Sequence, residues 1–298
     1  MKPKFKILLI KILLGFFILI CLWSFFIEPN IIEVEKISIK IENLPISFKG
    51  TKIIQLSDFH SKKFGKKEKK VLQILNDLKP DFIFITGDVI DWKTKNFKEI
   101  QKFWLELSKK FEGKIFAIYG NHDYWNRDFK IFDILFKESK IKILNNQSEK
   151  IKKGEDFIYL IGISEPCPNF DGLNYNNFRK ICYDKLQKIY HNNLQIIFKG
   201  VGDEKIPKIL LAHSPEIFRE VKNFSSKIDL TLVGHTHGGQ INIPFLANLI
   251  LPVKYDKKYK EGLFKEDSKY LYVNRGVGES GLPIRFNSFP EITLIELK

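Results

Sequence analysis

Ten polar side chains in this sequence are of the types that bind divalent metals or move protons, and they fall into five short motifs. The motif residues are Asp58 and His60, Asp88 and Asp91, Asn121, His122 and Asp123, His213, and His235 and His237. The chain has 298 residues but only 6 His, and all of the histidines except His191 belong to this set. Scattered structural histidines would not be concentrated in this way, so the set predicts one chemical site.

The mixture of carboxylates and imidazoles suggests which metals the site would bind. Oxygen and nitrogen ligands together suit Mn, Fe or Zn better than Mg or Ca. The set contains too many ligands for one tetrahedral ion, whereas two metal ions about 3.5–4 Å apart, bridged by one carboxylate, would use them all. The residue types therefore predict two divalent metal ions and leave their identity open.

Two of the motifs have their chemical residues spaced two apart: Asp58 with His60, and His235 with His237. In a strand, alternate side chains point to the same face. If strand geometry persists through these motifs, both members of each pair face the same way. We expect each pair to bracket one metal ion, or two adjacent ones.

Each motif directly follows a short apolar run, and such runs predict buried strands. The runs lie at 52–56, 82–86, 115–119, 209–212 and 229–233, and helical spacing occurs at 68–78, 97–111 and 129–137. Alternating strands and helices predict a layered α/β domain. In such sheets functional groups gather beyond the carboxyl ends of the strands, which is where the motifs are.

The remaining segments complete this prediction. Residues 33–41 alternate apolar and charged residues, which favours an edge-like strand, and 142–163 favours two or three short strands. Residues 175–191 have helical spacing, and we expect 192–207 to be a surface excursion. The segments 270–274 and 291–297 are expected to be strands that close the sheets.

The first 30 residues differ from the rest of the chain. Lys2, Lys4 and Lys6 precede an apolar stretch at 7–27, in which Lys11 is near enough to the basic end to snorkel. About 20 apolar residues span a bilayer, so residues 1–30 are expected to be a single-pass membrane anchor and 31–298 the catalytic domain. A cleaved signal peptide fits poorly because no small-x-small site follows, and a buried core helix is the other alternative. Lysines before the span predict the N-terminus inside and the domain outside the cytoplasm.

The overall charge leaves several kinds of partner open. The net charge is +14, from 49 Lys and Arg against 35 Asp and Glu. This suits nucleic acid, an anionic membrane surface or an anionic substrate, although Lys is also simply the common surface residue of this chain. No arginine-rich arm is present, which argues against nucleic acid. The 3 Cys form no CxxC motif, and whether Cys167 and Cys182 pair is left open.

The order of the motifs resembles that of a known family. The motifs follow the pattern of the calcineurin-like metallophosphoesterases; they are Asp-x-His60, Gly-Asp-x-x-Asp91, Gly-Asn-His-Asp123, a lone His213 and Gly-His-x-His237. The resemblance covers roughly residues 50 to 298. The closing segments are similar to a membrane-linked branch that includes a Bacillus phosphodiesterase of the cell envelope and hydrolases of UDP-2,3-diacylglucosamine; they are Gly-Gly-Gln240, Asn-Arg-Gly276, Pro-x-Arg285 and Pro-Glu291.

The resemblance implies a fold and a role for each residue. The fold would be α/β, with two packed mixed β-sheets flanked by helices in a four-layer sandwich, here preceded by one N-terminal transmembrane helix. Asp88 would bridge two metal ions, Asp91 would support the site, His122 would protonate the leaving group and Asp123 would orient His122. The other ligands would be Asp58, His60 and His237 for one metal and Asn121, His213 and His235 for the second.

The function predicted from these residues is a membrane-anchored, metal-dependent phosphoesterase. It would hydrolyse a phosphodiester or pyrophosphate bond in a phosphorylated small molecule or a lipid-linked envelope substrate. A nuclease-type phosphodiesterase and a metal-free protein-binding scaffold are the alternatives; the complete ligand set disfavours the scaffold, and no protein partner is implied. Arg275 and Arg285 either contact the phosphate or pair structurally. Many members of the family have an Asp near position 163, where this chain has Ser164 and Glu165. This difference bears on the geometry of the substrate loop.

Overall fold

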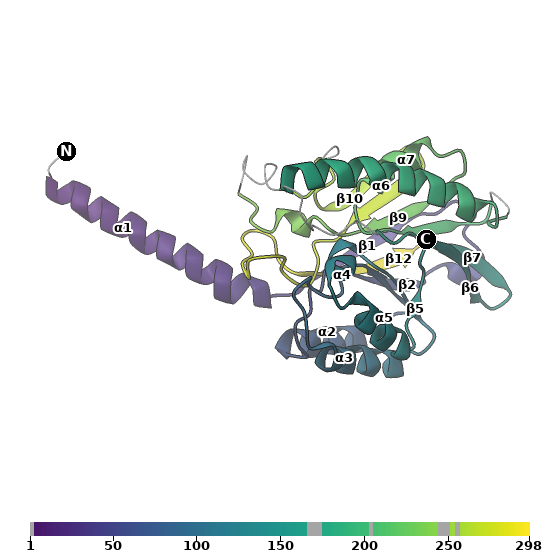
Figure 1. The fold of residues 1–298 in the computed structure, drawn as a ribbon, viewed down its shortest axis with the longest axis horizontal. Coiled ribbons are helices and arrows are strands. Elements are labelled where there is room, and N and C mark those ends of the chain that lie inside the picture. The colour runs from purple at the N-terminus through teal and green to yellow at the C-terminus, as the bar shows by residue number, and fades with distance from the viewer. Residues whose placement is uncertain (1–2, 166–174, 203–204, 244–250, 254–256) are drawn as a thin grey trace.

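Two six-stranded β-sheets pack face to face and carry helices on their outer faces, as Figure 1 shows. The computed structural model describes residues 3–165, 175–202, 205–243, 251–253 and 257–298. The first sheet has the order β1-β12-β2-β3-β4-β5 and the second has the order β10-β11-β9-β8-β7-β6. The α/β four-layer architecture predicted from the sequence is therefore confirmed.

The strand bounds agree closely with the apolar runs in the sequence. The first sheet consists of β1 (Glu33–Ile39), β2 (Lys52–Leu56), β3 (Phe82–Thr86), β4 (Ile115–Ile118), β5 (Lys142–Ile143) and β12 (Glu291–Leu297). The second consists of β6 (Gln147–Lys153), β7 (Asp156–Gly162), β8 (Lys208–Leu211), β9 (Leu230–Val233), β10 (Gly262–Glu266) and β11 (Lys269–Val273). The expected edge strand is β1, at one end of the first sheet.

Parallel pairing at the centre of each sheet brings the polar motifs to one edge. Strands β2, β3, β4 and β5 are parallel neighbours, as are β7, β8, β9 and β11. The carboxyl ends of parallel strands lie at the same edge of a sheet. The segments that follow β2, β3, β4, β8 and β9 therefore meet there, and these segments carry all ten polar residues.

The core lies between the two sheets and beneath the helices. Phe84 and Phe116 of the first sheet and Leu211 and Leu232 of the second belong to one buried cluster between the sheets. Strands β4 and β8 are buried at every position. This is the reason that β4, and β8 after Lys208, have unbroken apolar sequences: a strand covered on both faces has no polar side.

Helices cover each sheet from outside. The first sheet is covered by α2 (Lys66–Leu78), α3 (Phe97–Lys110) and α5 (Phe129–Glu138), and the second by α6 (Tyr175–Phe198) and α7 (Ile217–Asn223). The prediction of a surface excursion at 192–207 is wrong for the first half of that segment. Helix α6 continues to Phe198 and buries Leu194 and Ile197 against the second sheet. Cys167 and the side chain of Cys182 lie outside the described residues.

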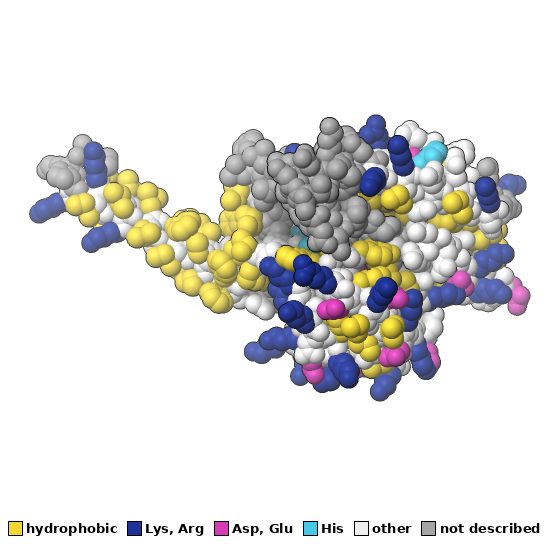
Figure 2. All heavy atoms as spheres, viewed as in Figure 1, with side chains coloured by type: hydrophobic (Ala, Val, Ile, Leu, Met, Phe, Trp, Pro, Cys, Tyr) yellow, Lys and Arg dark blue, Asp and Glu magenta, His cyan; other side chains and the backbone are white. Residues whose placement is uncertain are grey.

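The N-terminal segment projects from the body as a helix, α1 (Pro3–Leu22), which continues into a π-helical turn at Trp23–Ile27 and a 3₁₀ turn at Glu28–Asn30 (Figure 1). Residues Lys4–Asn30 have a mean hydropathy of 2.7 in their most apolar window, and none of that window is buried in the protein. Figure 2 shows apolar side chains along the projecting helix. The segment is long and apolar enough to cross a membrane.

Candidate metal centre

The backbone brings the site residues together by left-handed turns. Asp58, His60, Asp88, His235 and His237 have φ values of +50°, +44°, +52°, +71° and +50°. The expectation that strand geometry persists through the two spaced pairs is therefore wrong, although both pairs do converge. Residues other than glycine seldom adopt this conformation, Asp and His being among the more tolerant, and it clusters at functional sites because surrounding contacts must hold it.

Glycines beside the motifs allow the loops to approach one another. A Cβ on Gly234 would lie 2.0 Å from Ser57 Oγ and 2.1 Å from Asp58 Oδ2. A Cβ on Gly120 would lie 2.3 Å from Asp88 Oδ1. Neither position can carry a side chain without moving a carboxylate of the site, so the glycines in these motifs are required by close contact.

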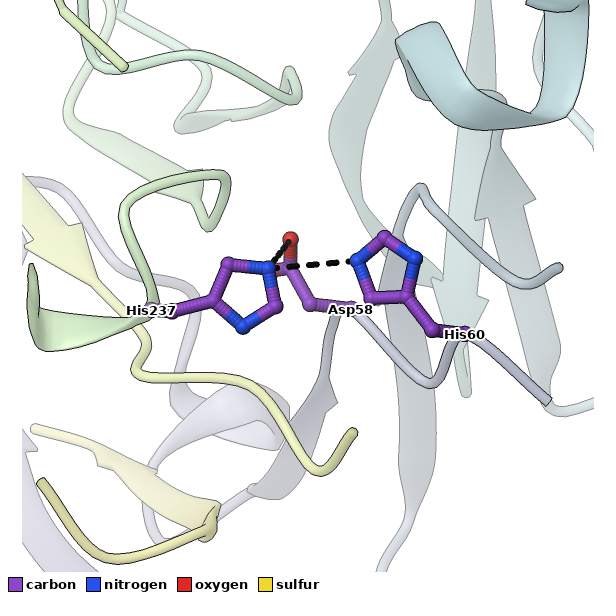
Figure 3. A group of neighbouring side chains, drawn as sticks. All are labelled: Asp58, His60 and His237. Atoms are coloured by element: carbon purple, nitrogen blue, oxygen red, sulfur yellow. Dashed lines mark hydrogen bonds and ion pairs between the residues drawn. The ribbon is translucent and has the colours of Figure 1, made fainter. Parts of the chain in front are cut away.

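One group of candidate ligands joins the loop after β2 to the loop after β9. His60 Nε2 lies 3.2 Å from His237 Nε2, and His237 Nε2 lies 3.4 Å from Asp58 Oδ1. Figure 3 shows the three side chains pointing toward one another from opposite sides of the site. All three are buried, and their ligand atoms are close enough to hold one metal ion.

A second group lies beside the first and is connected to it by Asp88. His213 Nε2 is 3.2 Å from Asp88 Oδ2 and 3.1 Å from His235 Nδ1. Asp88 Oδ2 is also 3.5 Å from His60 Nε2 in the first group. A single carboxylate oxygen thus lies between two sets of imidazoles, the position a bridging ligand needs.

The outward nitrogens of two histidines fix how the inward ones are protonated. His213 Nδ1 lies 2.8 Å from the carbonyl oxygen of Thr86, and His235 Nε2 lies 3.2 Å from that of Pro252. A carbonyl only accepts, so these nitrogens carry the protons, and when both rings are neutral the facing pair, His213 Nε2 and His235 Nδ1, present lone pairs. Two lone pairs 3.1 Å apart repel each other unless a cation lies between them. The donor set therefore fits a metal ion.

Burial gives most of these imidazoles the form that binds metal. It lowers the pKa of His235 to about 3 and the pKa values of His60 and His237 well below the usual range. Burial also lowers the pKa of His213, but the facing Asp88 carboxylate more than offsets it, so in the absence of metal His213 is protonated. A bound metal would replace that proton.

Asn121 is a further candidate ligand, through its side-chain oxygen. It begins the short helix α4 (Asn121–Trp125) and is buried. Its Oδ1 is buried without a hydrogen-bond partner among the described residues. An unpaired buried acceptor costs about 1–3 kcal/mol, and a metal ion in the site would satisfy it.

One of the two acids near His122 makes other contacts than the sequence led us to expect. Asp123 accepts hydrogen bonds from the backbone N–H groups of Ile90 at 3.0 Å and Gly120 at 2.9 Å, so it holds two loops together and does not orient His122. The carboxylate facing His122 is Asp91, whose Oδ2 lies 3.9 Å from His122 Nδ1 and equally far from His60 Nδ1. The expected contact of Asp123 with His122 is therefore corrected to Asp91.

His122 differs from the other histidines in its surroundings. Its side chain is 13% exposed, whereas those of His60 and His213 are fully buried. His122 forms a third candidate ligand group together with His60 and Asp88. Its backbone N–H donates to Asp88 Oδ1 at 2.9 Å. Its side chain lines the open cavity, as do those of His235 and His237, so it is accessible to a substrate.

The side chains of Arg275 and Arg285 form hydrogen bonds and ion pairs within the protein. Arg285 is fully buried and donates to the carbonyl oxygens of Gly276 and Ser288, both at 2.9 Å. Arg275 forms ion pairs with Glu33 at 3.0 Å and Glu291 at 2.8 Å. Neither arginine is among the described residues that line the cavity. Of the two alternatives left by the sequence, structural pairing is the one that the structure supports.

The metal groups open into a cavity of about 1040 Å³. Its floor includes Asp88, Asn121, His122, His235 and His237. Its other walls are of two kinds. One wall is apolar and consists of Trp92, Trp125, Ile241, Pro252 and Leu282. The other is cationic and consists of Lys93, Lys95 and Arg127. The sequence interpretation missed these walls. Trp92, Lys93 and Lys95 directly follow Asp91 in the chain, and that adjacency was the available signal.

Comparison with known proteins shows what the chain is similar to. The family model described as calcineurin-like phosphoesterase matches residues 51–239. The metallophosphoesterase YkuE of Bacillus subtilis is 32% identical over 277 residues, which cover 92% of this chain and 88% of YkuE. A transmembrane protein with a metallophosphoesterase domain from Danio rerio is 30% identical, covering 91% of this chain and 57% of that protein. The UDP-2,3-diacylglucosamine pyrophosphatase LpxG of Chlamydia trachomatis is 28% identical, covering 93% of each chain.

Proposed function

The chain belongs to the calcineurin-like phosphoesterase family and is a metal-dependent phosphoesterase, and from this we propose that it is a membrane-anchored enzyme that hydrolyses a phosphodiester or pyrophosphate bond with two metal ions. The observation that carries the proposal is the geometry of Asp88. Its carboxylate lies between two groups of buried ligands, at the floor of a cavity that exposes His122.

Each metal ion is assigned its own ligands. Asp58, His60 and His237 hold one, and Asn121, His213 and His235 hold the other, with Asp88 between them. These assignments are supported by the short distances between the ligand atoms and by the unpaired Asn121 oxygen. When bound, Mn, Fe or Zn at these positions would neutralise the phosphate oxygens and activate a water molecule for attack.

His122 is proposed as the general acid. It faces the cavity from the side next to Asp88, where a leaving alkoxide would need a proton. Asp91 is proposed to support this histidine, because its Oδ2 lies 3.9 Å from His122 Nδ1. General acid catalysis by a positioned side chain contributes about 10²–10⁴-fold in rate, so this histidine accounts for a substantial part of the turnover.

The walls of the cavity favour an amphiphilic substrate. A volume of about 1040 Å³ exceeds what a simple phosphate ester needs and is at the upper end for ligand sites. Lys93, Lys95 and Arg127 complement anionic phosphates, and the apolar wall with Trp92 and Leu282 complements a hydrocarbon or aromatic portion. The likeness to LpxG, named for a diacylated sugar nucleotide, is consistent with a lipid-linked substrate.

The N-terminal helix is proposed as the membrane anchor, with residues 1–30 as the anchor and 31–298 as the catalytic domain. Its support is the length and apolarity of Lys4–Asn30 and the likeness to a transmembrane relative. Lys4 and Lys6 lie at the beginning of the span, which favours an N-terminus in the cytoplasm and a catalytic domain outside it. An anchored enzyme keeps its cavity within reach of lipid substrates.

A hydrolysis panel tests the proposed function. The full-length protein in detergent, loaded with Mn²⁺, is given an aryl phosphomonoester, an aryl phosphodiester, a UDP-linked diacylated sugar and DNA. We expect turnover of the diester and the UDP-linked lipid and none of DNA. Turnover of DNA alone would favour the nuclease alternative, and failure to bind metal with no turnover of any substrate would favour a scaffold.

A further inference from the structure

We propose that Glu28, at the end of the N-terminal helical segment, is a positioning residue that fixes the His237 side of the metal centre through Ser288. The inference rests on the proposed function only in taking His237 as a metal ligand. It extends that function because it makes the end of the anchor part of the metal site. Three observations carry it: the burial of Glu28, its hydrogen bonds, and the contact of Ser288 with His237.

Glu28 is a buried carboxylate with partners on both sides. Only 1% of the residue is exposed. Its Oε1 accepts from the backbone N–H of Ser288 at 2.6 Å, and its Oε2 accepts from the indole Nε1 of Trp23 at 2.9 Å. Ser288 and Glu28 are separated by 260 positions in the sequence. Burying a carboxylate is costly unless donors compensate it, so these hydrogen bonds are what hold Glu28 in place.

Ser288 connects Glu28 to the loop after β9, which contains His237. Its hydroxyl donates to the carbonyl oxygen of His237 at 2.7 Å. His237 is in the left-handed region with φ +50°, and Gly238 follows with φ +60°. Such a backbone persists only when its surroundings hold it. Ser288 is positioned to supply this restraint, because a Cβ on Gly238 would lie 2.7 Å from Ser288 Oγ.

A second contact fixes the same segment to the anchor. The backbone N–H of Arg285 donates to the carbonyl oxygen of Ser24, in the π-helical turn, at 3.1 Å. The last carbonyls of a helix have no partner within the helix, and here one of them is paired with the catalytic body. Arg285 Nη1 then donates to the carbonyl oxygen of Ser288 at 2.9 Å. The segment 285–288 is therefore clamped between the end of the anchor and His237.

Metal affinity, measured by equilibrium dialysis and Mn²⁺ spin resonance on full-length protein in detergent, tests the inference. Ser288→Ala removes only the hydroxyl that bonds His237. We expect this variant and Glu28→Ala to weaken one of the two Mn²⁺ sites by about 10-fold or more, the usual effect of losing a group that orients a ligand. Glu28→Gln keeps an oxygen for the Ser288 N–H and should retain most of the affinity.

Asp229→Ala is the matched control. Asp229 is also a buried carboxylate that accepts a backbone N–H, from Lys208 at 2.9 Å, but it lies just before β9, at the end of the strand opposite the metal loop. It should lower thermal stability and leave both metal affinities unchanged. If Ser288→Ala binds both Mn²⁺ ions as tightly as the wild type, the inference is wrong, whether or not Glu28→Ala folds. Wild-type protein that binds no metal would instead overturn the proposed function.

Discussion

At the scale of single residues, the proposed site separates buried candidate ligands from a candidate proton donor, His122, that lines the cavity. His60 and His213 are fully buried, with their Nε2 atoms directed at Asp88, whereas His122 lies at the wall of the cavity. The same residue type thus serves two purposes because of where each loop ends. Substitutions should separate these purposes by what each one removes: metal, turnover or stability.

His122→Ala should retain metal and lose turnover. The imidazole proposed as the proton donor is removed, while the two main ligand groups are left intact. We expect kcat to fall about 10²–10⁴-fold, with both Mn²⁺ ions still bound by dialysis. Loss of one ion from this variant would show that His122 is a ligand, as its grouping with His60 and Asp88 also permits.

Asp91→Asn and Asp123→Asn should differ in kind. Asp91 is the carboxylate beside His122, so its amide variant should lower kcat and shift the pH dependence of kcat with little change in KM. Asp123 binds two backbone N–H groups, so its amide variant loses one acceptor and should lower the free energy of unfolding by about 1–3 kcal/mol. Kinetics and thermal unfolding of both variants make the comparison. A larger kcat effect at Asp123 would restore it as the residue that orients His122.

The sequence predicted which residues form the site but not how they are held. Asp and His types after apolar runs were sufficient to identify the candidate ligand groups that the structure brings together. Their left-handed conformation was not predictable from a two-residue spacing, which fits a strand equally well. The contact partner of His122 was also misassigned, since it depends on which of two nearby acids the backbone N–H groups occupy.

At the scale of elements, the site depends on how closely the loops after parallel strands can approach. Gly234 follows β9, and its Cα faces the end of β2, where Ser57 and Asp58 lie. The contact joins the two sheets at the metal centre. The short, fully buried strands fix the ends of these loops, and the glycines remove the side chains that would keep the loops apart.

Gly234→Ala should remove at least one metal ion from the site. The added Cβ would lie about 2 Å from Ser57 Oγ and Asp58 Oδ2, so Asp58 must move out of its ligand group. We expect loss of at least one Mn²⁺ ion by dialysis. Gly200→Ala is the control, because its Cβ would approach nothing nearer than 3.7 Å. Wild-type metal content in Gly234→Ala would contradict the view that close loop approach creates the site.

Element prediction succeeded where burial is imposed from both sides. Strands β2 and β3 match the apolar runs at 52–56 and 82–86 residue for residue. The continuation of α6 to Phe198 was missed, because it depends on Leu194 and Ile197 finding the second sheet, a contact distant in sequence. Strand β10 was missed for a similar reason: it is defined by its antiparallel pairing with β11.

At the scale of the whole molecule, the N-terminal helical segment has an exposed part and a part that packs on the body, and the boundary between these two parts lies before residue 30. Ser24, Glu28 and Pro29 are buried against the body, whereas the helix before them is exposed along its length. The sequence predicted the apolar span, but it could not show that its end packs on the segment 285–288. That contact joins positions 260 residues apart.

Two truncations should locate this boundary. Removal of residues 1–19 takes away only the exposed part of the described helix and should leave the unfolding temperature close to that of the full chain. Removal of residues 1–30 also deletes Glu28, and a hydrogen bond to a charged group contributes about 1.5–3 kcal/mol, so unfolding should occur several degrees lower. Calorimetry of both in one detergent makes the comparison. Equal unfolding temperatures would mean that the end of the anchor is only a tether.

The most direct measurement of the central claim is the Mn²⁺ spin resonance of the wild-type protein beside Asp88→Asn. Asp88 Oδ2 lies between the two ligand groups, 3.2 Å from His213 Nε2 and 3.5 Å from His60 Nε2. The geometry predicts two Mn²⁺ ions per chain with an exchange-coupled spectrum, and loss of that coupling in the variant. A single isolated ion in the wild type, or an unchanged coupled spectrum in Asp88→Asn, would contradict a metal centre bridged by this carboxylate.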